Sequence, residues 1–545
     1  MEVVSQGHGF TSQFNLYRLP NEMWIAIFEA MGEPSDLLKV IKTCKHFYAL
    51  AVRVLYRNLQ WISPISFVSN TRFWRKQTLA MTDVPTSLVV GISHINSNSF
   101  ARFDPTSAIV EIDGSWNITP PHPGHATINS MYQQPMHAPS SENPSDWRRY
   151  SFFASKGLYD TLSQMISTFS MLQELVFHHA ELPETIYPAI KSLPRLRHLA
   201  IQYCSLPVVH AEPDVTFAEL PITALTLWCS KADSDQSPTS NYVYALHLCT
   251  ARNLRVLKVD WTTVTARFFA LTTPHIQAVL PSGIEDLTLR MPVSKLWPSE
   301  GDASRTMLIV PLVAFLRSSP SIRRLSVYNR LPSLELDAAI LPNLNTYIGP
   351  LTTVVNVIRD RPVQHLEISD VDKKLTDFIN LLPEVARIRP DLKTLCLVMR
   401  EWDNEILHAV YQLFTDLRKI RIKYEDKYPS EYTLLSLGAQ FLHRFPLMEC
   451  LQLYQPGFPA PTILQSHADL PPSDVSSAND DHRDQGPGAA EDEDVKELII
   501  PWQRHCKFLK EVQFVEGVVW RRAFDGDEWC KRRLPTFDRY RELMG

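Results

Sequence analysis

The chain has little glycine and lacks the common catalytic signatures. It carries 17 glycines and 40 prolines among 545 residues, which disfavours Gly-rich phosphate loops and indicates many short elements with proline-marked ends. No Gly-x-x-x-x-Gly-Lys-Ser/Thr, Gly-x-Ser-x-Gly, His-Glu-x-x-His or Gly-x-Gly-x-x-Gly motif occurs. The sequence therefore predicts no phosphate, acyl-transfer, zinc or dinucleotide site, and we expect no cofactor.

Long apolar runs and an excess of basic charge are also absent. No segment approaches the roughly 18 apolar residues that a membrane span needs, and the N-terminus lacks the basic start and apolar core of a secretion signal. A net charge of −5 argues against general nucleic-acid binding. The eight cysteines form no Cys-x-x-Cys pair, which favours a reducing intracellular compartment, cytoplasm or nucleus. His122 and His125 have no Cys or carboxylate nearby, so we expect no metal site.

Residues 19–61 predict three short helices with more apolar surface than the helices can bury among themselves. Pro20 opens the first helical run, where its missing N–H costs nothing. Met23, Ile27 and Met31 follow on one face of that helix. Two further short helices complete the segment. Surplus apolar surface of this kind indicates a docking surface.

The order of residues in this segment resembles the F-box family. It runs Leu19-Pro-Asn-Glu22, an Ile and a Phe one turn on, Asp36-Leu-Leu38, Cys44-Lys-His-Phe47 and a Leu55-Tyr56 ending similar to that of fungal members. F-boxes dock on Skp1, which links them to a cullin–RING (SCF) ubiquitin ligase. The resemblance implies that the Skp1-facing and bundle-forming surface comprises Leu19, Pro20, Ile27, Leu37, Leu38, Cys44 and Phe47.

From residue 172 onward one phrase recurs: apolar-x-x-apolar-x-apolar. Its middle apolar position holds Leu175, Leu199, Leu225, Leu257, Leu287, Leu325, Leu366, Leu395, Ile420, Leu451 and Val512, with a degraded copy at Leu344 and Tyr347. Successive copies are 19 to 38 residues apart, apart from one step of 61. The alternation that ends each phrase predicts a short strand with one buried face, and the segments between phrases predict helices.

A strand and a helix cannot bury their own apolar faces, but stacked repeats of the pair can. The periodicity therefore predicts an α/β fold, in which the three-helix module precedes a curved parallel sheet with helices on its convex side. Residues 171–520 resemble a leucine-rich-repeat array. The stretch 196–206 matches the family's whole phrase, with Cys204 in the turn position that satisfies backbone groups. An irregular α/β enzyme is the alternative.

The rest of the chain divides around this array. We expect an N-terminal tail (1–18), the F-box (19–61), a connecting region (62–170), the array (171–520) and a C-terminal cap (521–545). The connecting region holds possible strands at 87–90 and 108–112 and an exposed loop at 116–147. Residues 468–494 carry nine acidic residues and few apolar ones, which predicts a disordered insertion within one repeat and explains the step of 61.

Residues that alternate with the buried apolar positions of a strand face outward. We expect this surface to bind a target protein through Trp228, Lys258, Asp260, Arg290, Arg324, Tyr328, His365, Glu367, Lys419, Arg421, Lys423 and Tyr454. In 417–423 basic residues alternate with apolar ones. These charges form either a solvated edge or a site for acidic ligand groups.

With the resemblance, these features predict a substrate-recognition adaptor of an SCF ubiquitin ligase that is not itself an enzyme. Its expected partners are Skp1 and a protein substrate, with neither nucleic acid nor membrane. Two alternatives stay open. One is a leucine-rich-repeat scaffold without a ligase role, and the other is an enzyme whose site the sequence does not reveal.

Overall fold

The computed structural model describes much of the chain in two units. The described residues are 19–31, 34–61, 70, 73–74, 79–91, 160–178, 180, 182–207, 217–229, 240–270, 281, 283–291, 302–329, 334–370, 374–426, 429–455, 489–523 and 528–533. The units comprise residues 1–251 and 252–545. The expected tail at 1–18, strand at 108–112, loop at 116–147 and histidines 122 and 125 lie outside the described residues.

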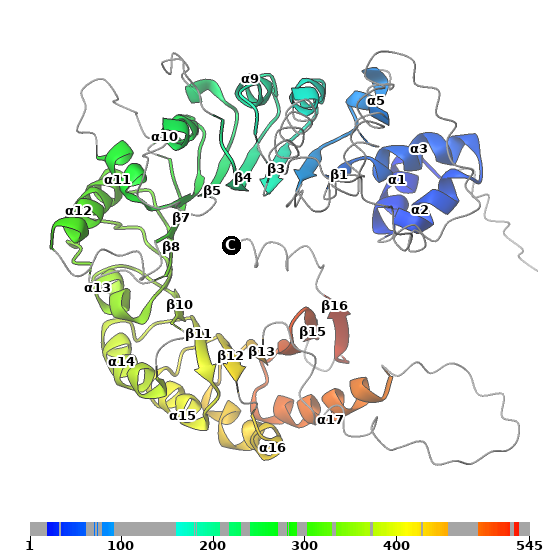
Figure 1. Cartoon of the computed structure of the whole chain (residues 1–545). Helices are drawn as coiled ribbons and strands as arrows, with labels where there is room; N and C mark the ends of the chain where they lie inside the picture. The colour runs from blue at the N-terminus through cyan, green and yellow to red at the C-terminus, as the bar shows by residue number, and fades with distance from the viewer. Residues whose placement is uncertain are drawn as a thin grey trace, which may run out of the picture. The chain divides into compact units, whose positions relative to one another are not determined.

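The first unit begins with three helices and continues as a parallel sheet (Figure 1). Its elements are α1 (Asn21–Ala30), α2 (Pro34–Ile41), α3 (Lys45–Leu55), β1 (Asn58–Trp61), α5 (Leu79–Thr82), β2 (Ser87–Val90), β3 (Glu174–His178), α9 (Ile186–Lys191), β4 (His198–Cys204), η4 (Phe217–Glu219), β5 (Ala224–Cys229), α10 (Ser240–Leu246) and η5 (His247–Thr250). Strands β1 to β5 pair in chain order, all parallel. The strand expected at 87–90 is therefore confirmed, and the end of the segment expected as an F-box supplies the first strand.

The second unit alternates strands and helices in the same way. Its elements are β6 (Val256–Asp260), α11 (Thr263–Phe269), β7 (Asp286–Arg290), α12 (Asp302–Ser318), β8 (Arg324–Tyr328), β9 (Thr346–Gly349), η7 (Leu351–Thr353), α13 (Val354–Ile358), β10 (His365–Ser369), α14 (Leu375–Ile388), β11 (Thr394–Glu401), α15 (Asn404–Leu413), β12 (Lys419–Asp426), α16 (Glu431–Gln440), η8 (Leu442–Arg444), β13 (Cys450–Gln455), α17 (Ala489–His505), β14 (Glu511–Val515), β15 (Val518–Arg521) and β16 (Cys530–Arg533). Strands β6 to β14 are parallel, whereas β15 and β16 pair antiparallel.

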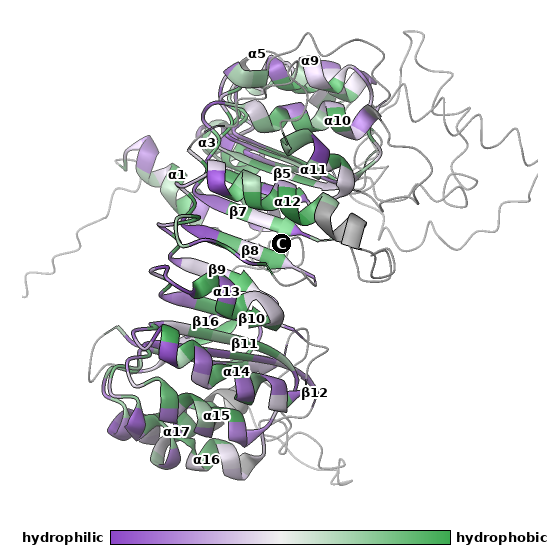
Figure 2. Ribbon diagram, turned by 90° about the vertical axis from the view of Figure 1, so that its left-hand side faces the viewer, coloured by the Kyte–Doolittle hydropathy of each residue, from purple (hydrophilic) through white to green (hydrophobic). Residues whose placement is uncertain are grey.

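The apolar positions of the phrase form continuous buried rows across each sheet. In the first unit Leu175, Leu199 and Leu225 are register partners on β3, β4 and β5, and none of them is exposed to solvent. In the second unit, Leu395 on β11 and Ile420 on β12 are register partners in a separate row of the same kind. Figure 2 shows hydrophobic and hydrophilic residues mixed within the visible strands and helices, as expected for elements that bury one face. The helices lie along one face of each sheet (Figure 1), and we call the other face the open face.

Neighbouring repeats are also joined by a recurring backbone contact at the entry of each strand. The carbonyl oxygen of Gln173 accepts the N–H groups of Arg197 and His198, at 2.8 and 2.9 Å. Arg418 does the same for Glu449 and Cys450, at 2.7 and 3.0 Å. One carbonyl thus satisfies two donors of the next repeat, which keeps the register of the strands constant.

The degraded copy of the phrase has a physical cause. Tyr347 on β9 occupies the middle apolar position, and its hydroxyl lies 2.6 Å from the hydroxyl of Thr353. A Cβ added to Gly349 would lie only 2.2 Å from the Tyr347 hydroxyl oxygen. The tyrosine ring therefore fills the space of two apolar side chains, and the third position of the phrase has to be glycine.

Two expected boundaries differ from the structure. Helix α17 begins at Ala489, so the last six residues of the acidic stretch 468–494 are helical. Acidic residues stabilise the first turns of a helix through its dipole, which is why composition alone misplaced this boundary. At the end of the array, β15 spans the expected boundary at 520.

Arg361 is a fully buried cation that holds a loop of the second unit in place. Its side chain is 1% exposed. The guanidinium donates to six backbone carbonyl oxygens at 2.7 to 3.4 Å, those of Leu336, Asp337, Ile340, Asn356, Val357 and Arg359. It joins the chain before β9 to the end of α13, where no regular ladder satisfies these carbonyls.

We predict that Arg361→Ala lowers the local stability around α13 by about 3 kcal/mol, because several buried carbonyl oxygens lose their donor. Hydrogen exchange of the α13 amides in the full chain measures this loss. The matched control is Arg359→Ala, since Arg359 is half exposed and contacts Glu384 at 3.6 Å. An exposed ion pair contributes less than about 1 kcal/mol. Equal loss of protection in the two variants would contradict the structural role of Arg361.

Candidate functional site

On the open face of the first unit, three polar side chains form a hydrogen-bonded row. Ser87, Glu174 and His198 are register partners on β2, β3 and β4. Ser87 Oγ donates to Glu174 Oε2 at 3.0 Å, and His198 Nδ1 lies 2.9 Å from Glu174 Oε1. The carboxylate separates the hydroxyl from the imidazole. The row therefore does not pair a nucleophile with a general base.

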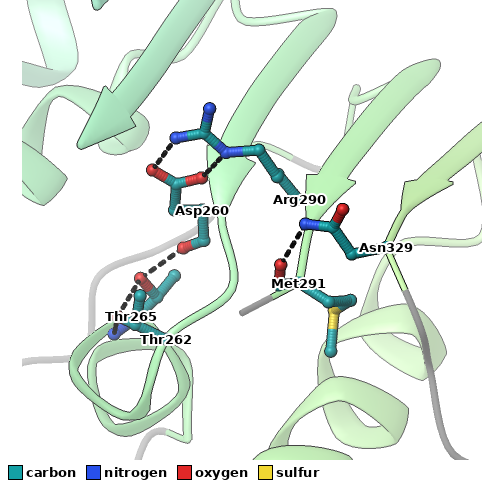
Figure 3. Close-up of polar contacts among 6 residues, drawn as sticks. All are labelled: Asp260, Thr262, Thr265, Arg290, Met291 and Asn329. Carbon is teal, nitrogen blue, oxygen red and sulfur yellow. Dashed lines mark hydrogen bonds and ion pairs between the residues drawn. The ribbon is translucent and has the colours of Figure 1, made fainter. Parts of the chain in front are cut away.

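On the second unit, Asp260 of β6 and Arg290 of β7 form a two-pronged ion pair (Figure 3). Arg290 Nε and Nη2 lie 2.5 and 2.8 Å from the two carboxylate oxygens of Asp260. The Asp260 carbonyl oxygen also accepts a hydrogen bond from Thr265 Oγ1 at 2.7 Å, which ties β6 to the start of α11. This geometry fixes Asp260 and leaves its side chain only 8% exposed.

The next strand ends in a similar backbone cap. Asn329 follows β8 with a positive φ of 67°, a conformation that asparagine tolerates better than most residues. Its Nδ2 donates to the Met291 carbonyl oxygen at 2.6 Å (Figure 3). In the first unit, Cys204 accepts the Ala180 N–H at 3.4 Å, as expected for the turn position of a repeat. Asn329 also satisfies a backbone group of the preceding repeat, but it donates to a carbonyl oxygen. It lies one position before the Asn or Cys position of the family phrase, so the sequence pattern did not identify it.

A row of basic side chains crosses the open face of the second unit, and we call it the basic row: Arg324 on β8, His365 on β10 and Lys419 on β12. The strands between them place Thr346 and Thr394 in the same register. His365 Nδ1 lies 2.9 Å from Thr394 Oγ1. Burial and the positive charges of Arg324 and Lys419 lower the pKa of His365, so the three side chains share one electrostatic environment.

A chain of hydrogen bonds positions Arg421 next to the basic row. Arg421 Nε lies 2.5 Å from the amide oxygen of Gln452, and Gln452 Nε2 donates to Glu511 Oε1 at 2.7 Å. Arg521 Nε binds the other oxygen of Glu511 at 2.7 Å. Burial acts to raise the pKa of Glu511, but hydrogen bonds from Cys450 and Arg521, with nearby positive charge, lower it overall. Glu511 is therefore the ionised anchor of this chain.

The structure corrects three of the twelve residues expected on the target-binding surface. Trp228, Asp260 and Tyr454 are 2%, 6% and 3% exposed, respectively. Trp228 lines a small cavity with Leu206 and with Tyr242 of α10. Asp260 is buried by its ion pair. The nine others are exposed or half-buried: Lys258, Arg290, Arg324, Tyr328, His365, Glu367, Lys419, Arg421 and Lys423.

The three N-terminal helices build a small core of their own. Phe28 of α1, Leu37 of α2 and Ala51 of α3 are buried together. The ring of Phe47 packs against Trp24 and Phe28, with centroids 4.6 and 5.4 Å apart. This aromatic cluster closes the bundle, since a pair of aromatic rings adds about 1 kcal/mol beyond burial of its area.

Four large apolar side chains of these helices are exposed, and we call them together the apolar patch: Met23, Ile27, Leu38 and Tyr48. These four side chains are 51%, 42%, 47% and 55% exposed. Met23 and Ile27 are one turn apart on α1 and therefore share a face. The bundle is joined to the sheet through Arg57, whose side chain binds Glu29 and whose carbonyl oxygen accepts the Thr86 N–H at 2.8 Å.

The family model named F-box-like matches residues 16–60, the segment that forms this bundle. Residues 16–60 are an F-box-like domain. Among curated proteins, none matches the chain. The match covers the three helices and ends within β1, so it says nothing about the repeats that follow.

Within the F-box-like domain, the residues singled out from the sequence divide into two groups. Pro20, Ile27, Leu38 and Cys44 are exposed and Leu19 is partly buried. Pro20 is the N-cap of α1, and the Cys44 sulfur accepts the Phe47 N–H at 3.4 Å as the N-cap of α3. Leu37, in contrast, is buried in the core and Phe47 is partly buried against it, so these two residues belong to the bundle-forming part of the expected set.

The apolar patch includes Met23, which the sequence places on one helical face with Ile27, and Tyr48, which was not singled out. Tyr48 gave no such signal, since a tyrosine one residue after Phe47 is equally compatible with the core.

No metal or membrane site emerges from the described residues. Within those parts of the chain, no group of three or more His, Cys, Asp or Glu side chains is arranged to hold a metal ion. Among the helices that the structure describes, none is both long and apolar enough to cross a membrane.

We predict that the neighbouring residues Leu37 and Leu38 respond oppositely to truncation. Leu37 is 5% exposed, and Leu37→Ala should cost roughly 2–5 kcal/mol of local stability. Leu38→Ala should cost less than about 0.5 kcal/mol, because Leu38 is largely solvated. Hydrogen exchange of the α1–α3 amides in the full chain distinguishes the two. Similar loss of protection in both variants would show that Leu38 is also part of the core.

Proposed function

We propose that the chain is the substrate-recognition adaptor of a cullin–RING (SCF) ubiquitin ligase. In this proposal the F-box-like domain docks on Skp1, and the open face of the sheet binds a target protein inside the cell. The chain is not itself an enzyme, because ubiquitin transfer is performed by other subunits. The parallel strand–helix units act as a leucine-rich-repeat array of variable repeat length.

The apolar patch is the observation that carries the proposal. A small helical bundle with its own core has no folding reason to keep Met23, Ile27 and Leu38 in water, since each would gain about 1.5–3 kcal/mol from burial. These side chains lie on the domain that matches the F-box-like family, and that family typically binds Skp1. The patch is therefore best explained as the Skp1-binding surface.

The open face supports the target-binding half of the proposal. Polar and charged side chains on successive strands make a broad surface that each repeat can vary independently, because the buried rows alone maintain the fold. The F-box-like domain and β1 to β5 belong to one unit. Arg57 follows α3, and its carbonyl oxygen accepts the N–H of Thr86 just before β2, so the helical domain is hydrogen-bonded to the sheet.

We predict that the double variant Ile27→Asp/Leu38→Asp binds Skp1 at least about 100-fold more weakly than the unmodified chain. Buried interface anchors each contribute roughly 2 kcal/mol or more, and buried carboxylates add a desolvation penalty. Isothermal titration with purified Skp1 measures the change, and hydrogen exchange verifies that α1–α3 remain folded.

The matched control is Met307→Asp/Val310→Asp on α12, where two apolar side chains are 55% and 60% exposed. This control should bind Skp1 within about twofold of the unmodified chain, because α12 is in the second unit. Failure of the unmodified chain to bind Skp1 would favour a repeat scaffold without a ligase role. Undiminished binding by the patch variant would show that Skp1 docks elsewhere.

A further inference from the structure

The open face of the second unit has an uneven charge distribution. On each strand, alternate residues point to the open face. On β8 to β12, these described residues include one carboxylate, Glu367, and four permanent cations: Arg324, Lys419, Arg421 and Lys423. On β6 and β7, the face positions carry two cations and two carboxylates, and one of these carboxylates, Asp286, lies 3.9 Å from Arg324 Nε of β8. Positive charge is therefore concentrated on β8 to β12, where it attracts acidic groups.

The basic row has a regular spacing. Arg324, His365 and Lys419 lie on every second strand, and Thr346 and Thr394 lie between them. Neighbouring strands are about 4.8 Å apart, so successive members of the row are about 10 Å apart. A peptide in the extended polyproline II conformation rises about 3.1 Å per residue and has three residues per turn, so every third side chain lies on one face and three residues span about the same distance.

The row is also pre-arranged for binding. Thr394 holds the His365 imidazole at 2.9 Å, and Gln452, a neutral amide, orients Arg421 at 2.5 Å. The threonine side chains are shorter than the basic ones on either side of them. Pre-arranged side chains lose less conformational entropy when they bind.

We propose that this face binds an extended acidic segment of a target protein that crosses the strands, with Asp or Glu at every third position along the basic row. That the partner is a target protein rests on the proposed function. The inference adds the chemical class of the recognised segment and the spacing of its acidic residues. Charge complementarity and the register of the sheet carry it.

The test uses the full chain and fluorescent peptides, independently of Skp1. The probe is Glu-Gly-Ser-Glu-Gly-Ser-Glu, and it is compared with a peptide of the same composition whose glutamates are contiguous and with a Gln analogue. The spaced acidic peptide should bind most tightly and weaken as ionic strength rises. The double variant Arg324→Glu/Lys419→Glu should weaken binding at least about tenfold.

The matched control is Arg323→Glu/Arg418→Glu, which makes the same change in net charge one residue earlier on the same two repeats. Arg323 and Arg418 are exposed and precede the face positions. Side chains at successive positions point to opposite sides of a strand, so this variant should stay within roughly threefold of the unmodified chain. Equal weakening by the two variants would overturn the proposal in favour of non-specific attraction.

A second readout follows from His365, which faces Arg324 and Lys419 across the sheet and shares β10 with Glu367. Peptide carboxylates favour the charged imidazole, so its pKa should rise on binding, as followed by NMR. The bound state then holds more protons, and affinity should increase as the pH falls from about 7.5 to about 5.5. His365→Gln should abolish that increase.

Three results would overturn the inference: equal binding of the contiguous peptide, undiminished binding by Arg324→Glu/Lys419→Glu, or binding of a phosphoserine analogue without binding of the glutamate peptide. The last result would assign the face to phosphorylated segments instead. None of these results depends on Skp1, which is measured separately through the F-box-like domain. Loss of Skp1 binding with retained peptide binding would remove the ligase assignment and leave the acidic specificity of the face.

Discussion

The fold depends on keeping one register across parallel strands. A single strand–helix unit exposes its apolar face, and the face is buried only when the next unit places its own leucines directly alongside. Leu199 and Leu225 illustrate this, since both are fully buried as register partners. The entry carbonyl that accepts two N–H groups from the next repeat enforces the same alignment. A slip of one residue would turn every apolar side chain toward water.

The same register determines what the open face can do. Because side chains alternate, each buried apolar position has a face position next to it, and equivalent face positions line up across strands. Arg324, His365 and Lys419 are separated by dozens of residues in the chain, yet they form one row. Residues that recur once per repeat in the sequence therefore lie at regular intervals across the sheet. This is the physical basis of the proposal that the face recognises an extended segment rather than a single group.

The F-box-like domain has to form a core from only three short helices. Its aromatic cluster of Trp24, Phe28 and Phe47 lets three short helices form a core. That leaves Ile27 and Leu38 available on the outside. The separation of core and exposed residues allows the exposed surface to be changed without disturbing the fold of the domain.

The sequence by itself determined the elements that follow from local periodicity. The F-box-like segment, the parallel strand–helix alternation and the strand at 87–90 were predictable, because helix and strand periods specify which residues are apolar together. The degraded copy at Tyr347 was visible, but its cause, the close approach of the ring to Gly349, required the packing.

Only the tertiary structure decided which residues of a pattern face a partner. Leu37 and Leu38 are identical in type and adjacent in the chain, yet one is buried and the other is exposed. Trp228 and Tyr454 occupy face positions by alternation but are buried, because large rings pack against neighbouring elements. Alternation assigns a side of a strand, whereas exposure depends on what the rest of the fold places there, and that information is not local.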